Sequence, residues 1–381
     1  MGAFHQMGSK SENLLAEEGL GRFCGAIISP VDYDEAQVAR QVTRFQTPDF
    51  ECIFDPQLYF PNTYRPLLRE WSYFPADVDT ADTTSRDWWD RISAGVSAAA
   101  CRVGARSSCS PAIVPRSYTL DYLRAMVEVG DRFAGLARQL GLDPVQTAIV
   151  SLDAVAMPAG AMEAASILFQ SSCPRVLLIF TGDLEPRREI GDVDQLTGAL
   201  RLVRELTAAG VETIVSYCST DVILYKAAGA QHVASGKFFN LRRFTTSRFE
   251  EPSVGGRQLP YFVEEGLLTL LREPDLLRLR RAGIALSDAT ERNPYSADVL
   301  GTVESGTGRA WLGLAWRQYL AWFADIESRI TDPLQADRLI EAAELGWARL
   351  GTIRPRVLMT EPLNDGSWLR PWRISLSELL S

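Results

Sequence analysis

A basic loop, Lys237–Arg257 (KFFNLRRFTTSRFEEPSVGGR), carries the strongest chemical signal in the sequence. The chain has 381 residues and a formal net charge of −9, so most of the molecule repels polyanions while this loop attracts one phosphate-bearing group. Guanidinium forks match phosphate oxygens in geometry. We interpret the loop as an anion site whose ligand-binding residues are Lys237, Asn240, Arg242, Arg243 and Arg248. The alternative is a solvated loop that forms salt bridges with Glu250 and Glu251.

Three carboxylates follow apolar runs that are typical of strands. Asp55 follows FECIF, Asp153 follows QTAIVSL, and Asp183 follows RVLLIF and a Thr-Gly pair. Carboxylates that converge on one cavity repel one another and raise some of their pKa values, which suits proton transfer. We therefore expect these three residues to be catalytic acids, bases or nucleophiles. An aspartate at a strand end can instead cap the next helix, and we expect that role for Asp34, Asp192 and Asp221.

The segment FDPQLYFP places Gln57 and Tyr59 between Pro56 and Pro61. Two fixed φ angles stiffen a loop, and a stiff loop with an amide and a phenol suits recognition of a planar ring such as a nucleobase. We expect Gln57 and Tyr59 to bind substrate there. A rigid cover over the barrel mouth is an equally good interpretation. Asp32, which follows the run GAIIS, belongs to the same set of strand ends.

The composition excludes several classes of site. The sequence has only two histidines, whereas zinc peptidase, amidohydrolase and two-His-one-carboxylate iron sites need at least two well-placed imidazoles. We expect no cofactor, with a Mg²⁺ ion held by carboxylates left open. The six cysteines are scattered without a CxxC pair, which predicts reduced thiols and a cytoplasmic location. No run of about 18 apolar residues occurs, so we expect no contact with a membrane.

Short apolar runs alternate with amphipathic helices along most of the chain. The expected strands are Gly25–Ser29, Phe50–Phe54, Ala112–Val114, Gln146–Leu152, Arg175–Phe180, Glu212–Tyr217, His232–Ser235 and Pro260–Val263. Apolar strands that are each followed by a helix predict a parallel sheet covered by helices. Eight of them in about 280 residues favour a (β/α)₈ TIM-like barrel. An open doubly wound sheet is the second choice, because GAIISPVDYDE lacks the glycine fingerprint of that fold.

We divide the chain into a flexible leader at 1–20, a barrel at 21–285 and a C-terminal helical, Trp-rich extension at 286–381. Two long helices are expected at Arg309–Ile330 and Pro333–Leu350. The first repeats tryptophans at helical spacing, which is typical of a packing face, and stacking on bases is the alternative. The extension could also bind a protein partner through its tryptophans, including Trp368 and Trp372.

The segment AAGAQHVASGKFFNLRRFTTSRF, followed by GGRQL, resembles part of the tRNA-guanine transglycosylase superfamily over residues 210–261. In that family a strand and a short helix lead to a Gly, a Phe-Asp pair and an arginine-bearing loop before a Gly-Arg. Asn240 takes the place of the family's nucleophilic Asp, and the family's Cys-x-Cys-x-x-Cys zinc cluster and Asp-Ser-Gly-Gly loop are missing. The resemblance implies a barrel and a ribose-phosphate or nucleic-acid ligand, with base exchange at that position lost.

Two functional hypotheses follow. The first is a barrel enzyme acting on a nucleoside, nucleotide or nucleic acid, with N-glycosidic cleavage or ribosyl transfer as the reaction, because carboxylates can stabilise an oxocarbenium-like transition state. Its partner would be a phosphate-bearing small molecule or a nucleic acid. The second is a catalytically inactive barrel that serves as a protein- or nucleic-acid-binding subunit of a larger assembly, which Asn240 favours.

Overall fold

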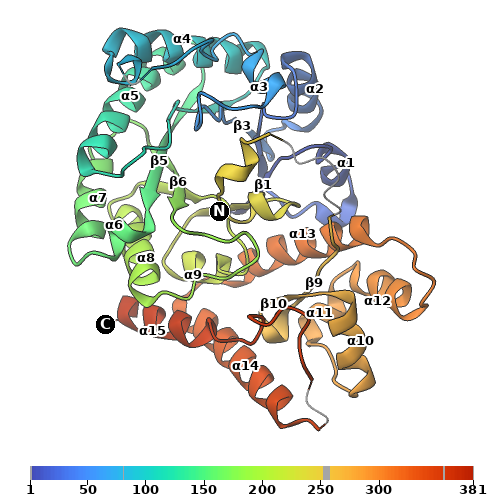
Figure 1. Cartoon of the computed structure of the whole chain (residues 1–381). Coiled ribbons are helices and arrows are strands. Elements are labelled where there is room, and N and C mark those ends of the chain that lie inside the picture. The colour runs from blue at the N-terminus through green and yellow to red at the C-terminus, as the bar shows by residue number, and fades with distance from the viewer. Residues whose placement is uncertain (1, 80, 252–257, 355–356, 381) are drawn as a thin grey trace.

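Eight parallel strands close into a barrel in the computed structural model, which describes residues 2–79, 81–251, 258–354 and 357–380 (Figure 1). The strands run in chain order, so each pairs with its sequence neighbours and β8 returns to β1. They are β1 (Gly2–Gln6), β2 (Gly25–Ile28), β3 (Glu51–Phe54), β4 (Ser107–Cys109), β5 (Asp143–Ser151), β6 (Arg175–Thr181), β7 (Glu212–Val215) and β8 (His232–Ser235). The predicted (β/α)₈ architecture with a C-terminal helical extension is confirmed.

The first strand corrects the prediction of a flexible leader at residues 1–20. Residues Gly2–Gln6 (GAFHQ) are all buried and pair in parallel with β2 and β8. The sequence of this strand has no β-branched residue and carries His5 and Gln6, so it does not look like a buried strand. Its burial is imposed by the barrel, which has no edge strand once β1 joins its two neighbours.

Two other strand predictions are wrong in position. The fourth strand lies at Ser107–Cys109 rather than at Ala112–Val114. The run at Pro260–Val263 does not enter the barrel, because β9 (Phe262–Glu264) pairs antiparallel with β10 (Thr269–Leu271) in a separate two-stranded sheet. The predicted number of eight barrel strands was therefore correct only because the prediction missed β1 and counted β9 in its place.

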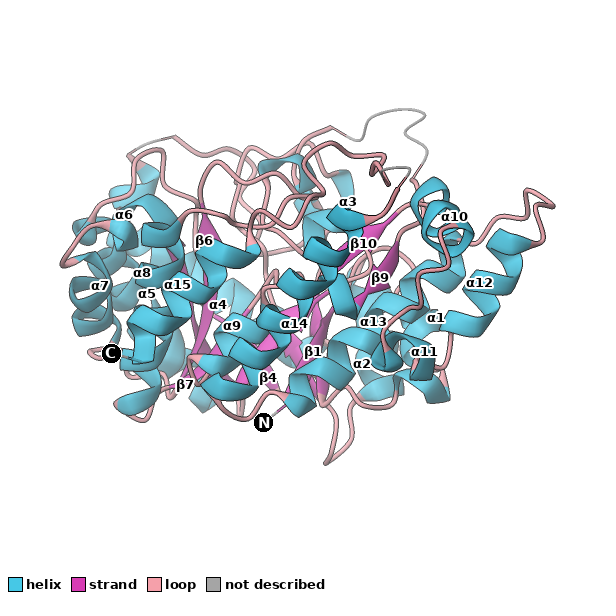
Figure 2. Ribbon diagram, turned by 90° about the horizontal axis from the view of Figure 1, so that it is seen from below, coloured by secondary structure: helices cyan, strands magenta, loops and turns pink. Residues whose placement is uncertain are grey.

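Helices cover the outside of the barrel, and the loops gather along one edge (Figure 2). Those between the strands are α1 (Glu12–Leu15), α2 (Glu35–Phe45), α3 (Pro66–Arg69), α4 (Arg86–Arg102), α5 (Leu120–Gln139), α6 (Leu152–Ala156), α7 (Gly160–Leu168), α8 (Val193–Ala208) and α9 (Val222–Ala227). Asp34 and Asp192 cap α2 and α8 as predicted, by accepting hydrogen bonds from Gln37 N and Gln195 N. Asp221 does not cap α9 with its side chain, which corrects that prediction.

The C-terminal extension completes the helical layer. Helix α10 (Glu273–Arg281) precedes it, and the extension itself contains α11 (Asp288–Arg292), α12 (Ser296–Glu304), α13 (Leu312–Arg329), α14 (Pro333–Thr352) and α15 (Leu369–Leu380). Helix α13 packs against β1 and β8, where Tyr319 Oη lies 2.7 Å from Ser235 Oγ. Trp322 on the same helix is 3% exposed, so its pattern marks a packing face as predicted. Trp368 and Trp372 are also buried, so they do not form an exposed surface for a partner.

A buried ion pair links the extension to the barrel layer. Lys226 Nζ of α9 lies 2.7 Å from Glu327 Oε1 of α13, and both side chains are 6% exposed. Removing one member of a buried pair leaves an uncompensated charge, which is more costly than losing the pair. No helix in the described part of the chain is both long and apolar enough to cross a bilayer.

We predict that Lys226→Met lowers the free energy of unfolding by about 3–5 kcal/mol, because the carboxylate of Glu327 stays buried without its partner. Urea denaturation measures this difference. The double variant Lys226→Met/Glu327→Leu is expected to recover most of the loss. The control Arg124→Ala removes an exposed ion pair with Asp121 and is expected to change stability by about 0.5 kcal/mol or less. Equal losses in the single and double variants would show that the unpaired charge is not the cause.

Candidate functional site

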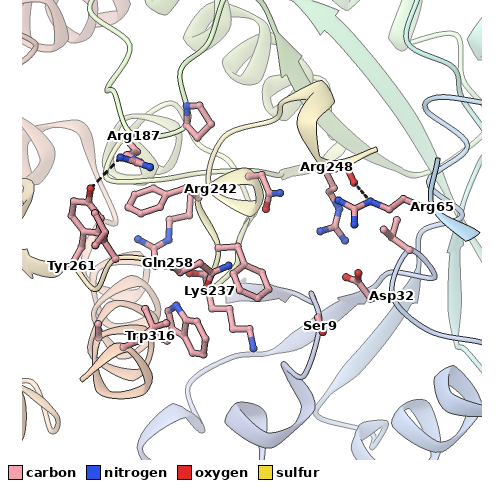
Figure 3. Close-up of a pocket in the computed structure, with 18 residues that line it drawn as sticks. Ser9, Asp32, Arg65, Arg187, Lys237, Arg242, Arg248, Gln258, Tyr261 and Trp316 are labelled. Atoms are coloured by element: carbon pink, nitrogen blue, oxygen red, sulfur yellow. Dashed lines mark hydrogen bonds between the residues drawn. The ribbon is translucent and has the colours of Figure 1, made fainter. Parts of the chain in front are cut away.

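A cavity of about 510 Å³ lies at the carboxyl ends of the barrel strands, beside α13 (Figure 3). Its wall comes from the loops after β1, β2, β3, β6 and β8, which supply Ser9, Asp32, Arg65, Arg187 and the segment from Lys237 onward. Trp316 and Ala315 of α13 close one side. Loops that follow barrel strands converge at this face, which is where barrel enzymes place their active sites.

The cavity is strongly cationic. Among the described residues that line it, five carry a positive charge and one carries a carboxylate: Arg65, Arg187, Lys237, Arg242, Arg248 and Asp32. Figure 3 shows Arg187 and Arg242 on one side and Arg65 and Arg248 on the other, with Lys237 between them. Such a cluster in an acidic chain concentrates its positive field on the cavity and favours an anionic ligand.

Arg242 is fixed by stacking and by backbone acceptors. Its guanidinium carbon lies 3.3 Å from the ring centroid of Tyr319 and 4.9 Å from that of Phe239. Its Nε donates to the carbonyl of Gly236 at 3.1 Å, and an Nη donates to the carbonyl of Lys237 at 3.0 Å. Burial lowers the pKa of Arg242 to about 10, so the side chain stays charged at neutral pH. The loop therefore presents a rigid cation.

Arg248 is held by a buried polar network beneath the cavity. Its Nη donates to Ser29 Oγ at 2.8 Å and its Nε to Gln57 Oε1 at 3.3 Å. Ser29 Oγ in turn donates to Gln57 Oε1 at 2.9 Å. The backbone carbonyl of Arg248 accepts a 2.7 Å hydrogen bond from Nε of Arg65. These contacts place two predicted site residues, Gln57 and Arg248, in the same hydrogen-bonded network.

Asp55 anchors that network and is fully buried. Gln57 donates to its carboxylate from N and from Nε2, both at 3.1 Å, and Tyr59 Oη donates at 2.9 Å. Burial raises the pKa of Asp55 to about 6, although these hydrogen bonds and the charge of Arg248 act in the opposite direction. Asp55 does not line the cavity, and neither do Gln57 and Tyr59, which corrects the prediction that these two bind substrate directly. Asp55 connects to the cavity through Gln57, which contacts Arg248. We assign it a positioning role.

Three non-glycine residues in the loops after β1, β3 and β7 have left-handed backbones. They are Lys10 with φ +57°, Gln57 with φ +48° and Tyr217 with φ +60°. Such conformations cost about 1–3 kcal/mol outside glycine and cluster at functional sites. At Gln57 the conformation lets both the backbone N–H and the side-chain amide reach Asp55. The two prolines around this segment do not indicate a positive φ, and Tyr217 carries no sequence signal at all.

Arg243 does not face the cavity, in contrast to the prediction. Its guanidinium is buried and forms ion pairs with Asp221 and, at 2.7 Å, with Glu189. Burial disfavours its charge, but these two carboxylates together raise the pKa of Arg243. The guanidinium is thus already neutralised within the protein. Arg257 lies outside the described residues.

The predicted cluster of carboxylates is not formed. Asp153 lies on α6, is exposed, and accepts a 2.8 Å hydrogen bond from Gln195 Nε2 of α8. Asp183 follows β6 and is also exposed. Neither residue lines the cavity. The cause is local, because α6 starts directly after β5 and turns Asp153 outward.

Asn240 and Asp32 are two polar residues of the cavity that have unused acceptors. Asn240 lines it, and its buried Oδ1 has no hydrogen-bond partner among the described residues. Asp32 is half-buried and makes no ion pair within the described part of the chain. Arg65 and Arg187, which sequence patterns did not single out, come from loops far from the basic segment. In the described residues no three His, Cys, Asp or Glu side chains gather into a metal-binding group.

Comparisons with known proteins do not assign the chain to a family. No family model matches it. A DNA ligase from Caulobacter sp. (strain K31) is 35% identical over 116 residues, which is 30% of this chain and 13% of the ligase. The chain therefore spans only a small part of that relative's length.

Solved structures with a similar arrangement show low similarity. A protein described as a deoxyribose-phosphate aldolase from Coccidioides immitis has 14% identity over 61% of this chain and 79% of its own, with a TM-score of 0.38. A type I 3-dehydroquinate dehydratase from Clostridium difficile has 8% identity over 65% and 88%, with a TM-score of 0.37. A D-psicose 3-epimerase from Clostridium cellulolyticum H10 has 10% identity over 87% and 100%, with a TM-score of 0.36. At these scores we draw nothing about the site from them.

We predict that Asp55→Asn gains stability relative to wild type as the pH rises from 4 to 7. The native state keeps the proton of Asp55 up to about pH 6, whereas the unfolded chain releases it near pH 3.8, so the contribution of Asp55 to stability falls as pH rises through this range. The shift corresponds to about 3 kcal/mol. The stability of Asp55→Asn minus that of wild type should therefore rise by about this amount from pH 4 to pH 7 in urea denaturation.

The matched control is Asp153→Asn, the same replacement at an exposed carboxylate outside the buried network. A difference between Asp55→Asn and wild type that stays constant across this pH range would show that burial does not raise the pKa of Asp55.

Proposed function

We propose that this chain is an enzyme that acts on a phosphate-bearing nucleoside, nucleotide or nucleic-acid substrate. The observation that carries the proposal is the cavity at the barrel mouth, in which five cationic side chains and one carboxylate meet. Two of these cations are held rigidly by hydrogen bonds, Arg242 to backbone carbonyls and Arg248 to Ser29 and Gln57. Preorganised guanidinium groups bind phosphate oxygens without the loss of side-chain entropy that accompanies ordering on binding.

The reaction we propose is N-glycosidic cleavage or ribosyl transfer. Its transition state develops positive charge on the sugar ring, which a carboxylate in the cavity stabilises. Asp32 takes this role, because it is the carboxylate among the described residues that line the cavity. Asn240 supplies a free amide acceptor in the same cavity, which suits an amino or imino group of a base.

Two weaker lines support the substrate class. The resemblance of residues 210–261 to the tRNA-guanine transglycosylase superfamily implies a ribose-phosphate or nucleic-acid ligand, and it stays a hypothesis. The similarity of 116 residues to part of a DNA ligase agrees with a role in nucleic-acid metabolism. The proposal does not depend on either.

A catalytically inactive binding subunit is the second candidate. Asn240 favours it, since an amide is a poor nucleophile at the position where the resembling family has an aspartate. The buried Trp368 and Trp372 do not support it, because they leave no exposed tryptophan surface there for a partner. Both candidates require the anion site, and only the enzyme requires Asp32.

We predict that Arg242→Gln weakens binding of ribose 5-phosphate by about tenfold or more, because a charge-assisted hydrogen bond contributes about 1.5–3 kcal/mol. The slope of log affinity against log salt concentration should also become flatter. Isothermal titration calorimetry at several salt concentrations measures both. Arg124→Gln, an exposed arginine on α5, is the control and should bind as wild type does. Unchanged affinity and an unchanged salt slope in Arg242→Gln would show that the cavity is not the anion site.

For the reaction, we predict that Asp32→Asn lowers the rate of base release from a nucleotide or oligonucleotide substrate by about 10²–10⁴-fold. Binding of ribose 5-phosphate should persist, because the arginines remain. Free bases are separated and quantified by chromatography with mass detection across a panel of nucleosides, nucleotides and oligonucleotides. Wild-type protein that binds phosphate but releases no base from any member of the panel would favour the binding subunit instead.

A further inference from the structure

Lys237 introduces a primary amine into a cavity whose other cations are arginines. The chain contains only three lysines, Lys10, Lys226 and Lys237, against 36 arginines among its 39 basic residues. A guanidinium stays protonated in proteins and cannot act as a nucleophile, whereas a desolvated amine can attack a carbonyl carbon. Lys237 therefore adds a chemical capability that a phosphate site built from arginines does not need.

The side chain of Lys237 is packed away from water. It is 4% exposed although it lines the cavity, and its Nζ lies 4.5 Å from the ring centroid of Trp316 and 4.8 Å from that of Phe238. The stem is thus confined between the loop after β8 and helix α13. Confinement fixes the direction of the amine and removes part of its hydration, which disfavours the ammonium form.

No carboxylate holds Lys237 in an ion pair within the described residues. The contrast is Lys226, whose Nζ is engaged by Glu327 at 2.7 Å. The charged groups that act on Lys237 are Glu12, Asp32 and Lys10, and Arg242 shares its loop. His5 of β1 is fully buried, and burial and the charge of Lys237 lower its pKa to about 3, so it is neutral.

Burial lowers the pKa of Lys237 to about 8, with Lys10 acting in the same direction and the two carboxylates acting against it. At pH 7.5 roughly a quarter of the side chain is then neutral, compared with roughly one part in a thousand for an ordinary lysine. The two rings stabilise a cation at the same position. They would therefore also stabilise a protonated imine formed there.

The backbone before Lys237 is tightly fixed. A Cβ atom at Gly236 would lie 2.6 Å from the carbonyl oxygen of Gln6 and 2.6 Å from Cβ of Leu241, so only glycine fits. This close packing ties the loop to the end of β1. Lys237, two residues past the end of β8, consequently has a defined starting point for its side chain.

We propose that Lys237 is a nucleophile that forms a covalent imine with the aldehyde or ketone carbon of a phosphate-bearing sugar held in the cavity. The inference rests on the proposed function for the class of ligand. The lone pair of the neutral amine forms the C–N bond, and the carbonyl oxygen takes a proton to give a carbinolamine. Loss of that oxygen as water then gives the imine, so the net change is amine plus carbonyl to imine plus water. The cations on either side hold the phosphate, and Asp32 is the carboxylate in reach of the cavity for proton transfer.

The test is reductive trapping. The protein is incubated with sodium cyanoborohydride and either ribose 5-phosphate or an oligonucleotide with an abasic site, and the adduct is located by peptide mass spectrometry. We expect modification of Lys237 at pH 7.5 to exceed that of the exposed Lys10 by on the order of tenfold, with a rate that rises with pH to a plateau above about pH 8. The two probes distinguish a free sugar phosphate from a sugar within a nucleic acid.

Lys237→Arg keeps the charge and removes the nucleophile, so it should abolish the adduct while it still binds ribose 5-phosphate. Lys10→Arg is the matched control and should be trapped as wild type is. Wild-type protein that binds the probe but gives no adduct on Lys237 would overturn the imine and leave the proposed function standing. Failure to bind or trap either probe would overturn both. Adducts spread equally over Lys10, Lys226 and Lys237 would also contradict the proposal.

Discussion

Closure of the barrel between β1 and β8 is the constraint on which the site depends. Parallel pairing of Gly2–Gln6 with His232–Ser235 brings the start of the chain against the loop that carries Lys237 and Arg242. The close approach of Gly236 to the carbonyl oxygen of Gln6 fixes the start of this loop against the end of β1. Helix α13 then covers the seam and supplies Tyr319 and Trp316, the rings that pack on the two cations. Backbone pairing, packing and electrostatics thus converge at one end of the barrel.

The contacts of each charged side chain decide whether its charge is neutralised within the protein or stays available to a ligand. Arg243 and Arg242 are adjacent in sequence, yet one is neutralised by Asp221 and Glu189 while the other stacks on aromatic rings at the cavity. Stacking leaves the charge of Arg242 available to a ligand, because a ring face stabilises a cation without cancelling it. Asp55 shows the reverse arrangement, since it is buried, hydrogen-bonded and separated from the cavity by the residues that it orients. The positive electrostatic field of the cavity therefore comes from the cations that no carboxylate among the described residues neutralises.

The sequence predicted the parts of the fold that follow a simple period. Runs such as RVLLIF and ETIV became β6 and β7 because a strand covered on both faces is apolar throughout. It did not predict β1, whose His5 and Gln6 are buried only because closure requires a strand there. Among site residues, Lys237, Arg242 and Arg248 could be found from local charge. Asp153 turns outward because α6 starts directly after β5, and the run QTAIVSL does not show where the strand ends. The ion pairs of Arg243 and the approach of Arg65 and Arg187 depend on segments distant in sequence, which no local pattern encodes.

We propose that the cationic cavity at the barrel mouth binds the phosphate of a sugar-phosphate ligand. A crystal structure of the protein with ribose 5-phosphate tests this directly. We expect the phosphate within hydrogen-bond distance of guanidinium groups of Arg242 or Arg248, with the sugar carbon C1 directed toward Nζ of Lys237. A ligand bound outside this cavity, or a phosphate bound only by exposed arginines elsewhere, would contradict it.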